Sequence, residues 1–96
     1  WLEQMIADAI ECGAAGFKAD WINTAAVGRV LREQGKRASP VAIGKAITAL
    51  GYHKIGQASR GYWHDDPQQS DKRGQLYNRE PTANFANYGQ SQGYNL

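Results

Sequence analysis

Positively charged side chains are concentrated in the middle of this sequence. Between residues 28 and 64, seven Lys or Arg residues stand against one carboxylate, Glu33, for a net charge of +6. The flanking segments 1–27 and 65–96 carry net charges of −3 and −1. The seven cations are Arg29, Arg32, Lys36, Arg37, Lys45, Lys54 and Arg60. Cations gathered in one segment suit a polyanionic partner, whose counterions they release on binding. A solvated basic surface without a partner is the alternative interpretation.

The first half of this basic segment has the pattern of a short helix. Val27, Val30 and Leu31 recur at helical spacing and form one apolar face, which leaves Arg29 and Arg32 to point outward. We expect Thr24 to cap the start of this helix and a glycine at position 35 to end it. Lys36 and Arg37 then lie in a turn, where two adjacent cations could reach a phosphate or remain solvated.

A second helix is expected to follow this turn directly. Ser39 is a favourable N-cap, and proline at the first helical position needs no N–H partner. The apolar residues at 43, 47 and 50 face the core at helical spacing. The opposite flank holds Ala42, Lys45 and Thr48, which are small or singly charged. Such a flank permits close approach to DNA but has few groups for base readout, so we expect weak or shape-based sequence preference.

A basic hairpin is expected after these two helices. Residues 52–56 and 61–64 form its strands, with Ile55 and Trp63 facing inward, and residues 57–60 form its tip. Lys54 and Arg60 are its cations, and wings of this kind place a cation on a phosphate or in a minor groove. Replacing Lys45 and Arg60 together is expected to lower the salt slope of DNA binding by roughly 2.

The N-terminal segment completes the expected fold. Residues 1–12 have one apolar stripe and form an amphipathic helix that Gly13 ends. A short strand is expected near Trp21 and Ile22. The fold class is therefore α+β, mostly α, a winged helix-turn-helix with three helices and a small β-hairpin wing.

The C-terminal third differs in composition. From Pro67 onward the chain is rich in Gln, Asn, Gly, Ser and Tyr and has almost no aliphatic residues. We therefore predict a folded domain over 1–66 and a flexible, disordered tail over 67–96. Four aromatic residues in this tail could stack on the bases of single-stranded DNA, dock to a partner or pack back onto the domain. They are Tyr77, Phe85, Tyr88 and Tyr94.

Catalytic chemistry is not expected in this segment. A nucleotide-binding loop of the Gly-x-x-x-x-Gly-Lys-Ser/Thr type is missing from the sequence. His53, His64, Asp65 and Asp66 are the one metal-like group, but a zinc site needs a fixed ligand shell, and we expect no metal and no cofactor. A single cysteine, Cys12, excludes an internal disulfide, and no apolar run approaches a membrane span of about 20 residues. A cytoplasmic location without a membrane partner is expected, and the initial Trp1 suggests a piece of a longer protein.

Three runs of this sequence carry a family resemblance over residues 21–64. They are Val-Gly-Arg-Val-Leu-Arg-Glu-Gln-Gly (27–35), Ile-Gly-Lys-Ala-Ile-Thr-Ala-Leu-Gly-Tyr-His-Lys (43–54) and Arg-Gly-Tyr-Trp (60–63). The segment resembles the C-terminal winged-helix domain of phage and plasmid primase-helicases of the poxvirus and virulence-associated E types. The resemblance implies a parent that hydrolyses ATP and primes or unwinds DNA, with this piece binding DNA at an origin or fork. Fewer Arg and Lys residues on the wing, and the polar tail, depart from that pattern.

The sequence thus predicts a non-catalytic domain that binds double-stranded DNA. The expected phosphate contacts are Arg29, Arg32, Lys36 and Arg37, the groove-facing residues are Ser39, Ala42, Lys45 and Thr48, and the wing contacts are Lys54 and Arg60. A winged-helix transcription regulator and a protein–protein interaction module are the alternative hypotheses. An adjacent ATPase domain would favour replication, whereas salt-insensitive binding to a protein would favour the interaction module.

Overall fold

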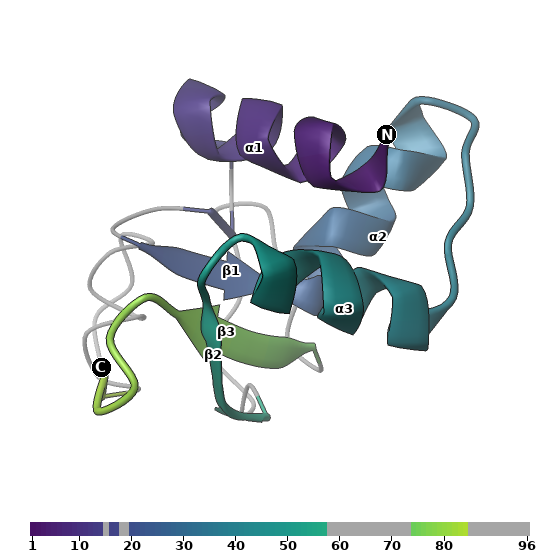
Figure 1. The fold of residues 1–96 in the computed structure, drawn as a ribbon. Coiled ribbons are helices and arrows are strands. Elements are labelled where there is room, and N and C mark those ends of the chain that lie inside the picture. The colour runs from purple at the N-terminus through teal and green to yellow at the C-terminus, as the bar shows by residue number, and fades with distance from the viewer. Residues whose placement is uncertain (15, 18–19, 58–73, 85–96) are drawn as a thin grey trace.

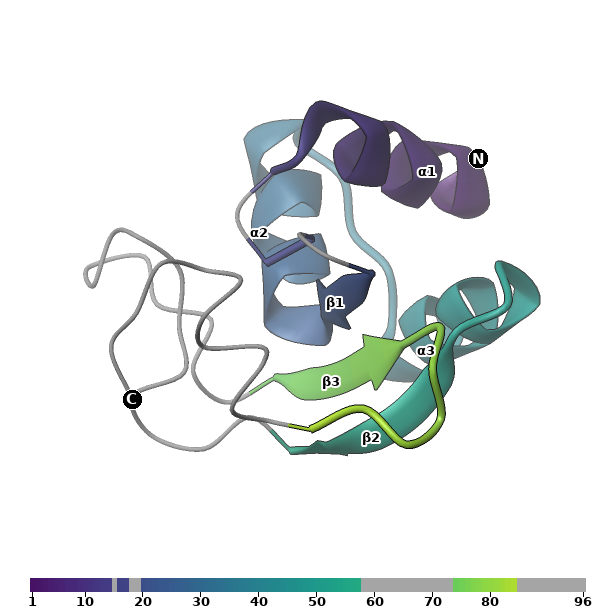
Figure 2. The same cartoon turned by 90° about the vertical axis from the view of Figure 1, so that its left-hand side faces the viewer.

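Three helices lie on one side of a three-stranded antiparallel sheet in the computed structural model (Figures 1 and 2). The structure describes residues 1–14, 16–17, 20–57 and 74–84. Along the chain the elements are α1 (Leu2–Cys12), β1 (Trp21–Asn23), α2 (Thr24–Glu33), α3 (Pro40–Ala49), β2 (His53–Gln57) and β3 (Gln75–Asn78). The strand order is β1-β3-β2, so the last strand of the described chain lies in the centre of the sheet. The expected α+β class and the expected helices are confirmed.

Helix α1 follows its apolar stripe. Met5, Ile6 and Ala9 are buried against the other helices, and the acidic residues of this helix are exposed. Gly13 adopts a left-handed conformation with φ of 65°, and its N–H donates to the carbonyl of Ile10. A residue without Cβ suits this conformation, and the predicted end of the helix is confirmed.

The start of α2 differs from the prediction in its capping residue. Asn23, the last residue of β1, accepts a hydrogen bond from the backbone N–H of Ala25 at 2.9 Å. The hydroxyl of Thr24, the expected cap, instead accepts from the backbone N–H of Gln75 at 2.8 Å. Thr24 therefore joins the start of β3 to the start of α2, and Asn23 takes the capping role.

Helix α3 begins as expected. The hydroxyl oxygen of Ser39 accepts from the backbone N–H of Ala42 at 3.1 Å, and Pro40 occupies the first turn. Ile43 and Ile47 are buried, and Leu50 is half-buried against the same core. This helix contacts both α1 and α2, which fixes its orientation in the fold.

The strand that pairs with β2 is not the predicted one. The expected second strand of the hairpin, residues 61–64, lies outside the described residues, and β2 pairs with β3 at residues 75–78. The prediction of a disordered tail from Pro67 onward is therefore wrong for Gln75–Asn78. Leu76 is fully buried there and packs with Trp21, and Ile55 and Ala83 contact this second cluster. Two hydrogen-bonded neighbours, β1 and β2, stabilise a strand whose own sequence has no clear apolar alternation.

The register determines which sheet face each side chain occupies. Tyr77 is opposite Ile22 of β1 and Lys54 of β2, and residues opposite one another in an antiparallel pair share a face. Ile22 and Tyr77 belong to the core cluster beneath the helices, so Lys54 also lies on the helix-facing side of the sheet. Trp21 and Leu76 lie on the other face.

Candidate nucleic-acid interface

An open hollow lies between α3 and β3. Its volume is about 530 Å³. It is lined by Pro40, Val41, Gly44, Lys45, Thr48 and Ala49 of α3 and by Tyr77 of β3. We call it the α3–β3 hollow. Val41 is 66% exposed, which is unusual for a branched apolar side chain. None of the described residues that line the hollow is acidic. A helix face of this composition is accessible to a large anionic surface.

A second groove runs between the start of α1 and α3. Its volume is about 780 Å³, and Arg37, Ala42 and Lys45 line its α3 side. Trp1, Leu2 and Glu3 form the α1 side. Lys45 lines both this groove and the α3–β3 hollow, so it stands between them. The structure therefore brings together Arg37, Ala42, Lys45 and Thr48, four of the residues predicted for the interface.

The two hydroxyl groups of the predicted site bond to backbone groups of α3. Thr48 donates its hydroxyl hydrogen to the carbonyl of Gly44 at 2.9 Å, one turn earlier. The hydroxyl oxygen of Ser39 caps the helix, although its own hydrogen remains available. Both residues are exposed, so a ligand can still be contacted by Ser39 as a donor and by Thr48 as an acceptor.

Lys54 lies on the same side of the molecule as α3. It is exposed, and its strand position opposite Tyr77 brings it beside the residue that lines the hollow. Arg60, the other predicted wing cation, lies outside the described residues. Of the two predicted wing cations, Lys54 is thus the one that the structure describes, and its strand partner Tyr77 lines the hollow.

Two of the predicted phosphate contacts lie elsewhere. Arg29 and Lys36 line a groove of about 490 Å³ between α1 and α2, which we call the α1–α2 groove. The Arg29 side chain is only 13% exposed and forms an ion pair with Glu33 at 3.6 Å, so the expectation that it points outward is wrong. The Lys36 ammonium lies 5.1 Å from the ring centroid of Trp1. Helix α1 faces this side of α2 across the groove, and the positions of these residues along the sequence could not reveal that arrangement. Arg32 is exposed.

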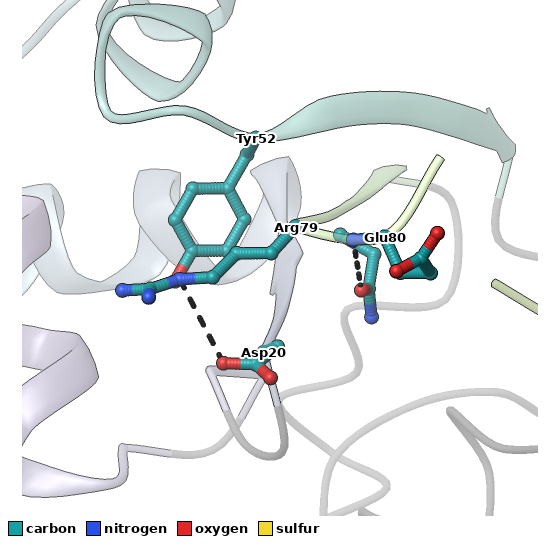
Figure 3. Close-up of polar contacts among 5 residues, drawn as sticks. Asp20, Tyr52, Arg79 and Glu80 are labelled. Atoms are coloured by element: carbon teal, nitrogen blue, oxygen red, sulfur yellow. Dashed lines mark hydrogen bonds and ion pairs between the residues drawn. The ribbon is translucent and has the colours of Figure 1, made fainter. Parts of the chain in front are cut away.

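Arg79 is a cation that the sequence did not single out. It follows β3, and its Nε donates to the hydroxyl of Tyr52 at 3.2 Å while the guanidinium lies 5.3 Å from that ring (Figure 3). Asp20, which precedes β1, lies 3.7 Å from Arg79 Nε. The hydrogen bond from Arg79 to Tyr52 raises the pKa of the guanidinium, and the charge of Asp20 adds to this. The Arg79 side chain, which follows β3, thus contacts both Asp20 before β1 and Tyr52 before β2.

Figure 3 also shows the turn that follows this cluster. Glu80 donates its backbone N–H to the side-chain oxygen of Asn78 at 2.8 Å, a local Asx-type bond that turns the chain directly after β3. This turn holds Arg79 over the ring of Tyr52. The Nε of Arg79 thus joins strand ends, while the rest of its exposed guanidinium is accessible to solvent.

Within residues 1–14, 16–17, 20–57 and 74–84, no three His, Cys, Asp or Glu side chains gather as metal ligands would. His64, Asp65 and Asp66 lie outside these ranges. No helix in the described part of the chain has the length and apolar character to cross a membrane.

Comparisons of this chain with protein-family models, with curated proteins and with solved structures find no match. We therefore infer the function of this chain from the geometry of the α3 surface and from the charges around it.

Proposed function

We propose that this chain is a non-catalytic domain of the winged helix-turn-helix type that binds double-stranded DNA through the exposed face of α3. The observation that carries the proposal is the composition of that face. Helix α3 has no acidic residue, and none of the described residues that line the α3–β3 hollow is acidic. Lys45 lines this hollow, Lys54 lies opposite Tyr77 of its lining, and Arg37 lies in the turn before α3, and all three are exposed. Phosphate contacts supply most of the affinity of such surfaces.

The arrangement of elements supports this proposal. Two 10-residue helices, α2 and α3, are joined by a short turn, and an antiparallel strand pair follows them in the sheet. In helix-turn-helix proteins the second helix enters the major groove. A helix with its side chains is about 10–12 Å in diameter and the major groove is about 12 Å wide, so α3 could lie in it with its exposed face toward the bases.

The distribution of charge also favours the α3 side. Helix α1 carries Glu3, Asp8 and Glu11, all exposed, and has no Lys or Arg. Glu3 lines the groove between α1 and α3 together with Arg37 and Lys45, so a polyanion would be attracted most strongly to the side of α3 that faces the α3–β3 hollow, where Lys45 and Lys54 lie. Apart from its one lysine, the exposed flank of α3 has small or aliphatic side chains, so affinity would come mainly from phosphates and sequence preference would be weak.

Salt dependence provides the decisive test. Fluorescence anisotropy with a labelled duplex and a labelled single strand is expected to show duplex binding that weakens as salt rises. Replacing Arg37 and Lys45 together with alanine is expected to lower the slope of log K against log salt by about 2, roughly one per lost phosphate contact.

Lys36→Ala serves as the matched control. It removes one positive charge from a residue that lies over the Trp1 ring in the α1–α2 groove. The slope of log K against log salt is therefore expected to stay unchanged. An unaltered slope in the double variant, or a loss confined to Lys36→Ala, would contradict the assignment of α3 as the binding face.

The α1–α2 groove favours one alternative, a protein-interaction module. Its lining mixes the apolar Met5 and Val30 with charges of both signs, and Trp1 beside it is 65% exposed. Salt-insensitive binding to a protein without any duplex binding would support that function instead. Within the DNA-binding proposal, the resemblance to primase-helicases favours replication over transcription regulation, and the presence of an adjacent ATPase domain in the parent chain would test it.

A further inference from the structure

Tyr77 has a buried ring and a hydroxyl group in the α3–β3 hollow. The side chain is 9% exposed, and its ring belongs to the core cluster beneath the helices. The hydroxyl lies beside α3, since a Cβ placed on Gly44 would be 3.2 Å from it. Among the residues that the structure describes, none forms a hydrogen bond with this hydroxyl. The phenol is therefore a nearly buried polar group that ends in an open hollow.

The ring of Tyr77 is buried, whereas its hydroxyl opens into the hollow and has no hydrogen-bond partner among the described residues, so it can bond to water or to a ligand. Two residues of α3, Thr48 and Gly44, line the same hollow but do not provide a hydrogen-bond partner for the Tyr77 hydroxyl. Thr48 donates to the carbonyl of Gly44, and Gly44 has no side chain. Glycine weakens the interior of a helix, yet at this position it leaves the space that the hydroxyl needs. The bonded hydroxyl of Thr48 and the missing side chain at Gly44 leave the Tyr77 hydroxyl accessible to a ligand.

The surroundings of the hydroxyl indicate the charge of that ligand. Lys45 lines the same hollow, and Lys54 is the cross-strand neighbour of Tyr77 on the same sheet face. Both lysines are exposed, and none of the described residues that line the hollow has a carboxylate. A hydrogen-bond donor beside two cations suits an anionic oxygen, and hydrogen bonds to charged acceptors are stronger than those between neutral groups.

We propose that Tyr77 is a DNA-binding residue whose hydroxyl donates a hydrogen bond to one backbone phosphate, with Lys45 providing the adjacent positive charge. The inference depends on the proposed function and assigns a specific contact to it. Tyrosine hydroxyls are among the groups that contact phosphates at protein–DNA interfaces. Strand β3 would then contribute to the interface from the centre of the sheet, where its position is held by two neighbouring strands.

The test uses Tyr77→Phe in the full chain, which keeps the packed ring and removes only the hydroxyl. Duplex affinity is expected to fall about tenfold, the effect of losing a hydrogen bond to a charged group. The salt slope is expected to stay at its original value, because a neutral phenol releases no counterion. Tyr52→Phe is the control: its hydroxyl accepts from Arg79, so its removal should leave duplex affinity unchanged.

A second variant tests the same contact without altering Tyr77. Gly44→Ala places a methyl group 3.2 Å from the hydroxyl and favours the helix, so the domain should remain folded while duplex affinity falls. A thermal melt of each variant verifies folding. Single methylphosphonate substitutions in the duplex then locate the contact: the original chain should lose more affinity than Tyr77→Phe at one position, where Tyr77→Phe keeps only the contact of Lys45.

The outcomes separate this inference from the proposed function. Salt-dependent duplex binding that is equal in the original chain and in folded Tyr77→Phe would overturn the tyrosine contact and leave the DNA-binding proposal in place. A Tyr77→Phe loss with unchanged sensitivity at every methylphosphonate position would overturn the phosphate assignment. Failure of the original chain to bind any duplex would overturn both proposals.

Discussion

Replacing Leu76 with alanine is expected to lower the free energy of unfolding by about 2–5 kcal/mol, the range for removing a large buried aliphatic side chain. Leu76 is fully buried, lies in the central strand β3 and packs against Trp21. Removal of the side chain leaves a cavity on this face of the sheet among Trp21, Ile55 and Ala83, since the hydrogen bonds to β1 and β2 keep the backbone of β3 in place. Chemical denaturation followed by circular dichroism would measure the change.

Val41→Ala is the matched control for Leu76→Ala. Val41 is also aliphatic but 66% exposed, so its replacement should change stability by less than about 0.5 kcal/mol. Equal denaturation midpoints for the two variants would contradict the position of β3. They would instead support the sequence-based hypothesis that residues 67–96 form a tail outside the folded domain.

Gly74→Ala is expected to destabilise the domain by about 2–4 kcal/mol, because it combines overpacking with loss of a helix cap. A Cβ at position 74 would collide with Oδ1 of Asn23 and lie 2.6 Å from the backbone nitrogen of Ala25. These two atoms form the hydrogen bond that caps α2. The added methyl group would therefore separate the start of β3 from the start of α2 or displace the capping side chain.

Two control variants separate the contributions to this effect. Gly13→Ala meets no atom within 4 Å, so it should show only the cost of a left-handed conformation, about 1 kcal/mol. Asn23→Ala removes the cap without the collision and should cost about 0.5–2 kcal/mol. Thermal or chemical denaturation of all three would test the prediction. A loss in Gly74→Ala no greater than in Asn23→Ala would show that the collision is relieved.

The helices could be predicted because their signals are local. Apolar spacing identified α1, and Gly13 marked its end, while Ser39 and Pro40 marked the start of α3. The predicted cap of α2, Thr24, was wrong, although Asn23 is as suitable a residue type for this position. The structure assigns the cap to Asn23 because Thr24 bonds to Gln75, which is 51 residues further along the chain.

Strand β3 could not be predicted because its stability is nonlocal. Its four residues contain one aliphatic side chain, Leu76, within a polar segment. The strand exists through pairing with β1, more than 50 residues away, and with β2. Tyr77 was consequently placed in a tail, as a residue that could stack on bases, whereas its ring lies in the core and its hydroxyl reaches α3.

The sequence by itself determined the three helices, the end of α1, the start of α3 and the concentration of cations in the middle of the chain, because periodicity, capping and charge are properties of neighbouring residues. Only the tertiary structure decided which cations share a surface. It placed Arg29 and Lys36 in the groove beside α1 and brought Lys45, Lys54 and Tyr77 to the same side of the sheet. Strand register and helix packing join residues that are distant along the chain, and no local pattern encodes those distances.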